Sequence, residues 1–338
     1  MNSSGNCDIM FSVEVDMLSG KLSDKELTEN VLKIIKRRRK EVLVGAGIGL
    51  DCAELDMSGK LLITSDPITA SCSDAGVLAV DINANDIYAS FGEPLALELI
   101  ILAPVNASLD DIKKIVFDAE RRAEELNIEI VGGHTEFTDA VNRMVVCVTM
   151  VGIKKSSTAT RQPKIGDSIV MTKYAAIETS IILSGKLSLD EMKDFLNNKD
   201  IAELALFRDM LSIKKEAEIL AEENIGIMHD ITEGGVLNAV NEMCRGGNFG
   251  CKIDESKIPV KDVSLKLCDK FNIDFKKSVS SGSVLFTASE PNNVIKRLEK
   301  EGINATKIGE IIPEEILSKS DSGDKIIQSE KDEIFKIK

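Results

Sequence analysis

Aromatic side chains are scarce in this chain. Among 338 residues there is no tryptophan, with only two tyrosines and eleven phenylalanines. Leucine, isoleucine, valine, methionine and alanine must therefore provide most of the core packing. Hydrophobic residues still make up 43% of the sequence, which is enough for ordinary cores. Because a chain of this length exceeds what one core usually organises, we expect two domains.

Long apolar runs and a secretory leader are also lacking. The longest apolar stretch, Leu95 to Val105, contains Glu98 and is shorter than the roughly 20 residues that a bilayer crossing needs. The N-terminal sequence has no basic start followed by an apolar block. We therefore expect a cytoplasmic protein with no membrane partner.

Paired cysteines and excess positive charge are absent as well. The seven cysteines include no C-x-x-C pair, so reduced thiols are expected rather than disulfides or a zinc site. The net charge of -14 disfavours nucleic acid as a partner. A capping-box pattern at Ser23 predicts a helix that ends in the basic run 36–40. We interpret that run as a solvated helix end and not as a nucleic-acid patch.

Short β-like runs alternate with helical runs from Glu41 onward, which indicates mixed α/β layers around a sheet. A polar stretch at 154–167 is the best domain boundary. We predict an N-terminal extension and helix at 1–40, an N-terminal domain at 41–155 and a C-terminal domain at 163–338. Strands are expected at 60–67, 95–104, 128–133, 142–152, 168–173, 224–230, 283–288 and 305–312, and helices at 76–91, 108–127, 233–244 and 292–302, with 175–222 mostly helical.

Acidic residues stand at the ends of apolar elements in the N-terminal half. Asp51 follows the glycine turn GAGIGLD, Asp66 closes a strand, and Asp81, Asn85 and Asp86 lie on the helix at 76–91. Polar groups are costly to bury unless something binds them, and separated carboxylates suit a hard cation such as Mg2+. Turn formation or helix capping is the alternative, and we weigh the two equally.

Three glycine-rich stretches could approach phosphate. The turn with Gly47 and Gly49 lacks the context of a dinucleotide fingerprint or a P-loop, which leaves a tight turn or phosphate-facing amides. VGGHTEF (131–137) predicts a turn after a strand. In HDITEGG (229–235), Thr232 can cap a helix whose first turn holds two glycines, although glycine costs about 1 kcal/mol relative to alanine inside a helix. Free amides facing an anion would offset that cost. The turn at 278–284 is a weaker candidate of the same kind.

Seven motifs in order resemble the aminoimidazole ribonucleotide (AIR) synthase-related, PurM-like superfamily. They are VLVGAGIGLDCAEL, ITSDPIT, DINANDIYASFGEPLAL, VGGHTEF, GDSIVMTK, GIMHDITEGGVLNAVNE and SSGSVLF. The resemblance covers about residues 40–315, and NAND, GGHTE and HDITEGG look most like the hydrogenase maturation factor (HypE) branch.

The resemblance implies a two-domain subunit whose N-terminal α/β domain pairs with a second copy to close a β-barrel, while the C-terminal domain is an α/β sandwich. It implies ATP between the domains, with Mg2+ on Asp51, Asp66 and Asp86. The other residues expected to contact the nucleotide are Gly47, Gly49, Asn85, Gly132, Gly133, Thr135, Lys173, Gly234 and Gly235. The candidates for catalysis are His229, Asp230, Glu233 and His134.

Three positions depart from the pattern of that superfamily. Leu50 stands where an acid is usual, and Ala176 and Thr179 replace glycines near Lys173. The first hypothesis is an Mg-dependent enzyme that uses ATP to phosphorylate or dehydratively activate an oxygen of a small metabolite. The alternatives are a catalytically weak ATP-binding accessory homodimer and a phosphotransferase like thiamine-monophosphate kinase.

Overall fold

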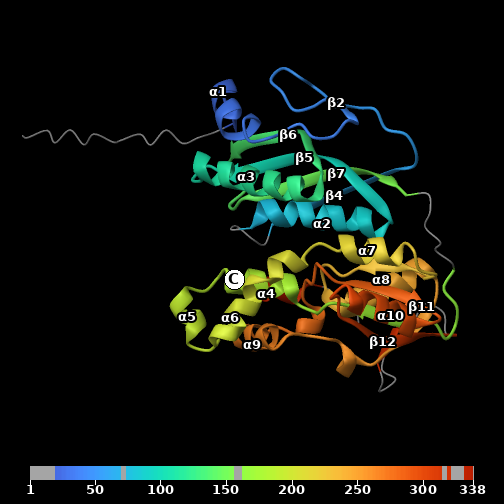
Figure 1. Ribbon diagram of the computed structural model, residues 1–338. Coiled ribbons are helices and arrows are strands. Elements are labelled where there is room, and N and C mark those ends of the chain that lie inside the picture. The colour runs from blue at the N-terminus through green and yellow to red at the C-terminus, as the bar shows by residue number, and fades with distance from the viewer. Residues whose placement is uncertain (1–19, 70–73, 156–161, 314–317, 321–330, 338) are drawn as a thin grey trace, which may run out of the picture.

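The computed structural model describes residues 20–69, 74–155, 162–313, 318–320 and 331–337. These residues form two main sheets, each with its own helices, and the chain builds one after the other (Figure 1). The chain is therefore a mixed α/β protein, as predicted. Over the same ranges, no helix combines the length and the apolar composition that a membrane crossing requires.

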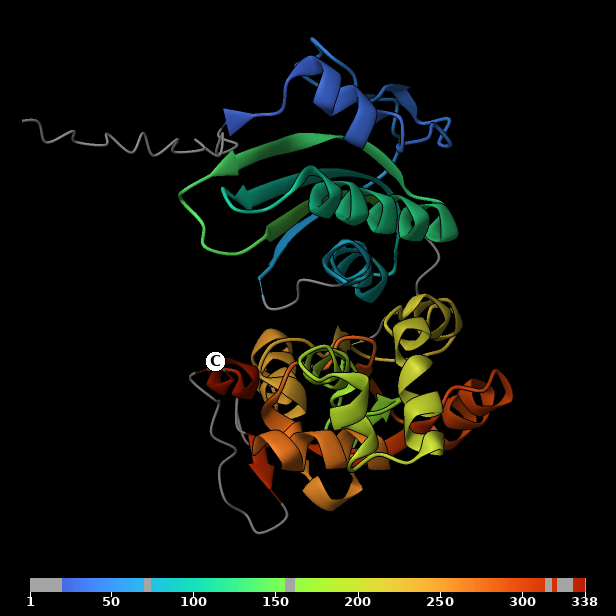
Figure 2. The same cartoon turned by 90° about the vertical axis from the view of Figure 1, so that its left-hand side faces the viewer.

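The N-terminal sheet has five strands in the order β1-β6-β5-β7-β4. Their bounds are β1 (Gly20–Lys21), β4 (Leu61–Ile68), β5 (Gly92–Pro104), β6 (Glu129–Thr138) and β7 (Val145–Lys154). Only β5 and β6 pair in parallel, with α3 (Leu109–Leu126) as their crossover. Helices α2 (Ala75–Ala89) and α3 lie on one side of the sheet (Figure 2). The hairpin of β2 (Val42–Val44) and β3 (Glu54–Leu55) packs against Ala96 and Val131 on the other.

Helix α2 is buried on nearly every side, with 12 of its 15 residues inaccessible to solvent. It packs on the N-terminal sheet and also contacts the C-terminal half of the chain. Burial on nearly every side is typical of a helix in the interior of a larger protein. Its polar residues have protein partners: Asp81 pairs with Arg122, and the Asn83 side chain accepts a hydrogen bond from the Asp66 amide. Burial of Asp81 therefore does not require an external ligand.

The N-terminal segment differs from its prediction. Helix α1 (Asp24–Leu27) and the π-helical turn η1 (Thr28–Leu32) end at Leu32, and the basic run that follows is not helical. Arg37 pairs with Glu129 at 2.9 Å, and Glu129 also accepts hydrogen bonds from the backbone amides of Arg38 and Arg39. Since Glu129 is fully buried, its charge needs these partners. The prediction of a solvated helix end was wrong, because the run fastens the segment to β6.

The C-terminal sheet has six strands in the order β13-β10-β12-β8-β11-β9. Their bounds are β8 (Ser168–Thr172), β9 (Met228–Asp230), β10 (Gly250–Ile253), β11 (Val284–Ala288), β12 (Ala305–Ile312) and β13 (Ser318–Ser320). Successive residues of β8 face different cores, because Ile169 packs with α8 (Gly235–Gly247) and Val170 with the opposite layer. That layer holds α4 (Ile177–Ser184), α7 (Lys214–Leu220), α9 (Asp262–Phe271) and α10 (Pro291–Lys300). Shorter helices are α5 (Leu189–Lys193), α6 (Asn198–Ala205), η2 (Phe207–Met210), η3 (Glu255–Lys257), η4 (Phe275–Lys277) and η5 (Glu333–Lys336).

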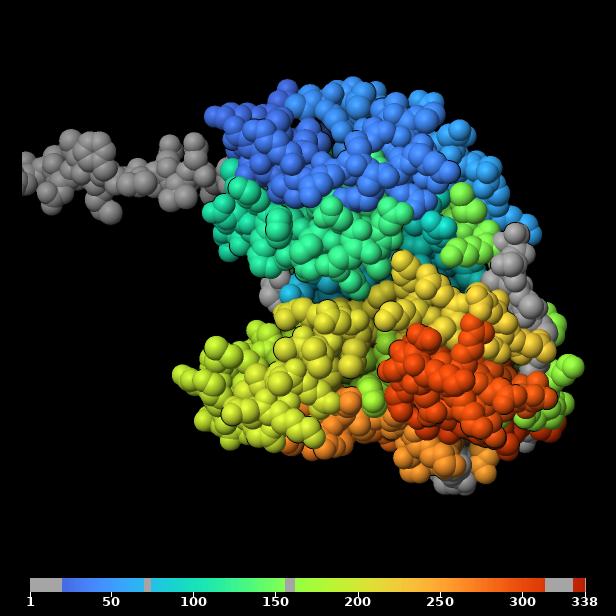
Figure 3. All heavy atoms as spheres, in the orientation of Figure 1, coloured from blue at the N-terminus to red at the C-terminus, as the bar shows by residue number. Residues whose placement is uncertain are grey.

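The two halves meet along a boundary that Figure 3 shows from one side. Asn85 of α2 reaches across it: its side chain donates to the Leu211 carbonyl oxygen at 2.8 Å and accepts from the Ile213 amide at 3.0 Å. Asp74, at the start of α2, accepts two hydrogen bonds from Arg208. These contacts hold α2 against the C-terminal half near both of its ends, and they give the buried Asn85 a structural function.

Candidate functional site

A cavity of about 440 Å³ lies between the two halves, and we call it the interdomain cavity. Strand β4 and helix α2 form one wall, while α4, β9 and the turn η5 form the other. Its carboxyl-bearing residues are Asp66, Asp86, Glu178, Asp230, Glu233 and Asp332, and His229 also lines it. Among the lining residues that the structure describes there is no lysine or arginine. The cavity is therefore strongly acidic.

Three aspartates of this cavity affect one another. Burial, together with the neighbouring charges of Asp230 and Asp66, raises the pKa of Asp86 to about 7 against the hydrogen bond that Thr64 donates. Such a shift means that the site opposes a third negative charge while no cation is present. A cation nearby would allow the carboxyl groups to ionise together.

His229 and Asp230 extend the group from β9. Burial lowers the pKa of His229, but its hydrogen bond to Glu242, at 3.2 Å, and the charge of Asp230 outweigh that effect and leave the pKa above its ordinary value. Burial raises the pKa of Asp230, and the charge of His229 opposes the rise. The Oδ2 atom of Asp230 is buried and has no hydrogen-bond partner. The predicted residues His229, Asp230 and Glu233 thus share one cavity with Asp66 and Asp86.

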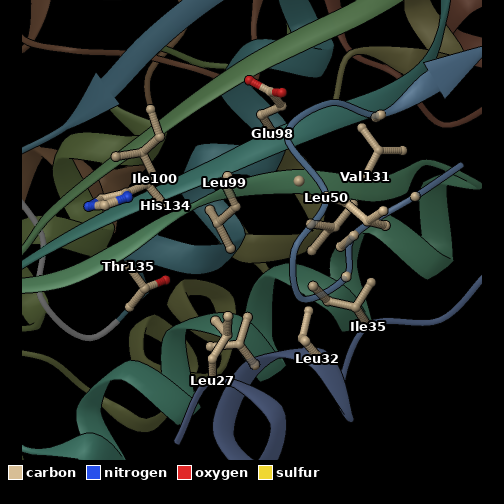
Figure 4. Close-up of a pocket in the computed structure, with 18 of the residues that line it drawn as sticks. Leu27, Leu32, Ile35, Leu50, Glu98, Leu99, Ile100, Val131, His134 and Thr135 are labelled. Carbon is tan, nitrogen blue, oxygen red and sulfur yellow. The ribbon is translucent and has the colours of Figure 1, made fainter. Parts of the chain in front are cut away.

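His134 and Asp51 lie elsewhere, in a second hollow of about 280 Å³ that we call the N-terminal pocket. Leu27, Leu32 and Ile35 of the N-terminal segment gather around Leu50 on one side of this pocket, and His134 and Glu98 lie on the strands that form the other (Figure 4). Gly47, Gly132, Gly133 and Thr135 also line it. Within one subunit, the predicted metal set of Asp51, Asp66 and Asp86 is therefore divided between two pockets. Nowhere in the described ranges do three histidine, cysteine, aspartate or glutamate side chains form a group that could hold a metal ion.

The predicted turn at 131–137 is part of strand β6, which continues to Thr138. Gly133 has a φ of +140°, and a Cβ there would lie 1.9 Å from the Leu99 carbonyl oxygen. The close parallel pairing with β5 therefore requires glycine at this position. The turn prediction was wrong, because the segment is extended and Gly133 serves strand packing. At Gly132 a Cβ would have room, and His134 lies 3.1 Å from Glu136 along the same strand.

The glycine turn 45–49 is a turn, as predicted. Gly49 has a φ of +72° and nothing within 4 Å of an added Cβ, so glycine is needed there for the backbone conformation alone. At Gly47 an added Cβ would lie 2.8 Å from the Leu50 side chain. A phosphate contact at either glycine stays a prediction.

Lys173 is fully engaged by protein atoms. Its ammonium group donates to the carbonyl oxygens of Met210, Ser212 and Gly282, at 2.7–2.9 Å, and lies 2.7 Å from the buried Glu216 carboxylate. An ammonium group has three donors, so none is left for a phosphate. The structure therefore gives Lys173 a structural function in place of the expected nucleotide contact.

The N-terminus of α8 is already capped by a carboxylate. Asp332 of the C-terminal turn accepts a hydrogen bond from the Gly234 amide at 2.5 Å. Gly235 has a φ of +66°, and a Cβ there would lie 2.7 Å from backbone atoms of Lys276 and Ser278. The two glycines allow close backbone packing, and no side chain of the helix itself caps it. The predictions of a Thr232 cap and of free amides open to an anion were wrong.

The side chains of the serine-rich stretch 278–284 are also directed into the protein interior. Ser278, Ser280, Ser281 and Ser283 are all buried. The Ser280 hydroxyl accepts a hydrogen bond from the Ala176 amide, and the Ser283 hydroxyl donates to the Tyr174 carbonyl oxygen at 2.8 Å. At least these two serines satisfy the backbone of the neighbouring segment, so they do not form an open anion-binding turn.

Glu178 was not predicted as a site residue. It lies in the first turn of α4, is 5% exposed and lines the interdomain cavity. Burial raises its pKa to about 7, although Ser281 beside it opposes the shift. The only signal in the sequence is an acid surrounded by small and apolar residues in AAIETS. That signal does not distinguish a buried acid from an exposed one.

Comparisons with known proteins agree with the motif resemblance. The model of the AIR synthase related protein N-terminal domain matches residues 49–154, and that of the C-terminal domain matches residues 164–320. A putative hydrogenase expression/formation protein of Methanocaldococcus jannaschii is 29% identical over 280 residues, which are 79% of this chain and 80% of that protein. A selenide, water dikinase of Campylobacter jejuni is 26% identical, over 73% of this chain and 77% of its own length.

Among solved structures, the hydrogenase maturation protein HypE in complex with ATP has a TM-score of 0.74 at 20% identity. The match covers 92% of this chain and 95% of the HypE chain. At that identity the likeness concerns the fold alone. The fold of both halves of the chain is therefore shared with an ATP-binding protein.

Proposed function

Because the chain belongs to the AIR synthase related protein family, on its HypE-like branch, we propose that it is an Mg-dependent enzyme that uses ATP to phosphorylate or dehydratively activate an oxygen of a small metabolite. The observation that carries the proposal is the acidic interdomain cavity with Asp66, Asp86 and Asp230. Phosphoryl transfer depends mainly on positioning and on neutralising charge, and a cavity between two domains can position two reactants.

The charge of the cavity supports magnesium in particular. A triphosphate carries several negative charges, and the described lining of the cavity offers six carboxyl groups with no lysine or arginine. Phosphate oxygens could approach these carboxylates only with a hard cation between them, which is the coordination that Mg2+ adopts in nucleotide sites. Asp66 and Asp86 are the proposed ligands on this side of the cavity.

We place three further residues in this mechanism. The pKa of His229 lies above its ordinary value, so this side chain can hold a proton near the developing charge, while its hydrogen bond to Glu242 orients the ring and the charge of Asp230 favours the protonated form. Glu233, at the start of the segment leading to α8, faces the same cavity.

We also propose that the protein is a homodimer paired through the open face of the N-terminal sheet. On β4, Leu61 is 53% and Ile63 68% exposed. They stand opposite Ile153 and Val151 of β7, so the apolar side chains form one continuous surface. An edge strand with an exposed apolar face is a favourable place for a second sheet to pack.

Purified protein with Mg-ATP tests the proposal. We expect ATP consumption when the acceptor is present in a metabolite extract, and 31P NMR of the products then separates ADP-forming from AMP-forming chemistry. Asp66→Ala and Asp86→Asn should each abolish turnover, whereas Asp110→Asn, an exposed acid on α3, should leave it unchanged. Turnover that persists without Asp66 and Asp86 would refute the proposed site.

A second candidate function is a catalytically weak ATP-binding accessory protein. Leu50 favours it, because this position lies in the N-terminal pocket and offers no metal ligand. The engagement of Lys173 by protein atoms favours it as well. Tight ATP binding without turnover in any metabolite fraction would support this alternative over the enzyme.

A further inference from the structure

Two buried carboxyl groups of the interdomain cavity have oxygen atoms without a hydrogen-bond partner. They are Glu178 Oε2 and Asp230 Oδ2, and the two residues are 5% and 8% exposed. Three other buried glutamates with such atoms, Glu120, Glu129 and Glu216, form ion pairs with Arg38, Arg37 and Lys173. Within the described part of the chain, Glu178 and Asp230 have no such lysine or arginine, and both face the same cavity.

A buried carboxyl oxygen without a hydrogen-bond partner is costly, and Glu178 and Asp230 each have one such oxygen although Ser281 lies beside Glu178. Such a partner must donate hydrogen bonds, because a carboxylate can only accept them. The described side chains that line the cavity cannot provide a lysine or arginine. No lysine or arginine of the described lining serves these two oxygens, which leaves room for the cationic group of a ligand.

Glu178 belongs to a different part of the cavity from Asp66, Asp86 and Asp230. The pKa of Asp86 responds to Asp230 and Asp66, whereas that of Glu178 responds to Ser281 and Asp332. On α4, Ile182 lies one turn after Glu178 on the same helix face, and both line the cavity. Val279 and Ile334 also contribute apolar surface. This region thus combines one acid with an apolar wall, and we call it the Glu178 subsite.

We propose that the Glu178 subsite binds the ammonium group of an amine-bearing acceptor substrate, with the apolar part of that substrate against Ile182, Val279 and Ile334. That this amine is the acceptor of the reaction rests on the proposed ATP-using function. Binding of an amine at Glu178 does not depend on that function.

An ammonium group fits this subsite better than a neutral or anionic group. Burial without a cation keeps a proton on Glu178 near neutral pH, and an ammonium would replace that proton as the partner. Hydrogen bonds between two charged groups are about twice as strong as neutral ones. An anion would face the carboxyl groups of Glu178, Glu233 and Asp332 with no cation among the described lining residues.

Three probes of nearly equal shape separate these possibilities: benzylamine, benzyl alcohol and benzoate. Their binding to the full chain is measured by isothermal titration calorimetry, with and without Mg-ATP. We expect benzylamine alone to bind. Its affinity should fall by at least about tenfold in Glu178→Gln, because a hydrogen-bonded charge is lost, and should not change in Glu299→Gln, an exposed acid on α10.

Each of the other possible binding results either supports or overturns the proposal. Equal binding of benzyl alcohol, or stronger binding of benzoate, overturns the preference for a cation. If no probe binds while Mg-ATP binds normally, the subsite is refuted and the proposed function stands. If benzylamine binds in a Glu178-dependent manner and ATP does not bind, the subsite stands and the proposed function fails. Should Glu178→Gln fail to fold, Glu178→Asp decides, since a retracted carboxylate must weaken benzylamine binding and unchanged affinity overturns the proposal.

Discussion

Asn85 and Lys173 hold the same four-residue segment, Met210–Ile213, from the two sides of the domain boundary. Asn85 binds the Leu211 carbonyl oxygen and the Ile213 amide, while Lys173 binds the carbonyl oxygens of Met210 and Ser212. The backbone groups of this segment are thus shared between α2 of the first half and the end of β8 in the second. The position of the neighbouring Asp86 in the interdomain cavity depends on this connection.

Replacing Asn85 with alanine should destabilise the protein. Two buried backbone groups would lose their partners, and each unsatisfied group costs about 1–3 kcal/mol. We expect the free energy of unfolding in urea to fall by about 2 kcal/mol or more, with a loss of Mg-ATP binding that follows the loss of the domain contact. Asn142→Ala, at an exposed position before β7, is the control. Unchanged stability with weakened ATP binding would instead indicate a direct nucleotide contact.

Replacing Lys173 with methionine should leave the Glu216 carboxylate buried without its ion pair. Breaking a buried pair on one side costs about 3–5 kcal/mol. We expect a marked fall in the melting temperature, and partial recovery in the double variant Lys173→Met with Glu216→Leu, because both charges are then removed. A nucleotide function for Lys173 predicts the opposite pattern, in which both variants fold normally and bind ATP poorly.

Gly235→Ala tests whether the glycine pair of HDITEGG serves packing or ligand binding. A methyl group at this position would lie 2.7 Å from backbone atoms in a left-handed conformation, so we expect a loss of stability of about 1–3 kcal/mol. Gly246→Ala, near the end of the same helix, meets nothing within 4 Å and should be neutral or stabilising. Circular-dichroism melts of the two variants provide the comparison. Normal stability of Gly235→Ala with impaired ligand binding would restore the anion-site interpretation.

Stability should fall as the pH rises from about 4 toward 7. Burial raises the folded-state pKa of Asp86 and of Glu178 to about 7, above their unfolded values. The folded state therefore binds more protons than the unfolded state in this range, and the stabilisation is lost as these protons dissociate. Urea titrations at several pH values should show a shallower dependence in Asp86→Asn and in Glu178→Gln. An equally steep dependence in both variants would mean that other groups control it.

The positions of helices and strands were predicted better from the sequence than the structural functions of the individual residues within them. The predicted helix 76–91 and the predicted strand 305–312 agree with α2 and β12. The function of Asn85 could not be predicted, because its partners Leu211 and Ile213 lie more than a hundred positions away along the chain. Gly133 was misinterpreted for a similar reason, since the carbonyl oxygen that excludes a side chain there belongs to another strand.

The candidate site was predictable only in part. Motif order led to Asp66, Asp86, His229 and Asp230, which the structure brings into one cavity, although their chemical functions stay predictions. Glu178 could not be found in the same way, because its importance depends on burial, and burial depends on the packing of α4 against the sheet and the C-terminal turn. A single sequence does not contain that information.

The hydrogen bond between the Asp332 carboxylate and the Gly234 amide also determines which ligands can bind that amide in place of Asp332. Because Asp332 is covalently part of the same chain, its effective concentration at the helix is that of a tethered group, in the millimolar range or above. A free monovalent anion at lower concentration is therefore displaced by the protein itself. Only a ligand that gains additional contacts elsewhere in the cavity can displace Asp332 from this amide. The intramolecular carboxylate therefore favours ligands that bind at more than one point.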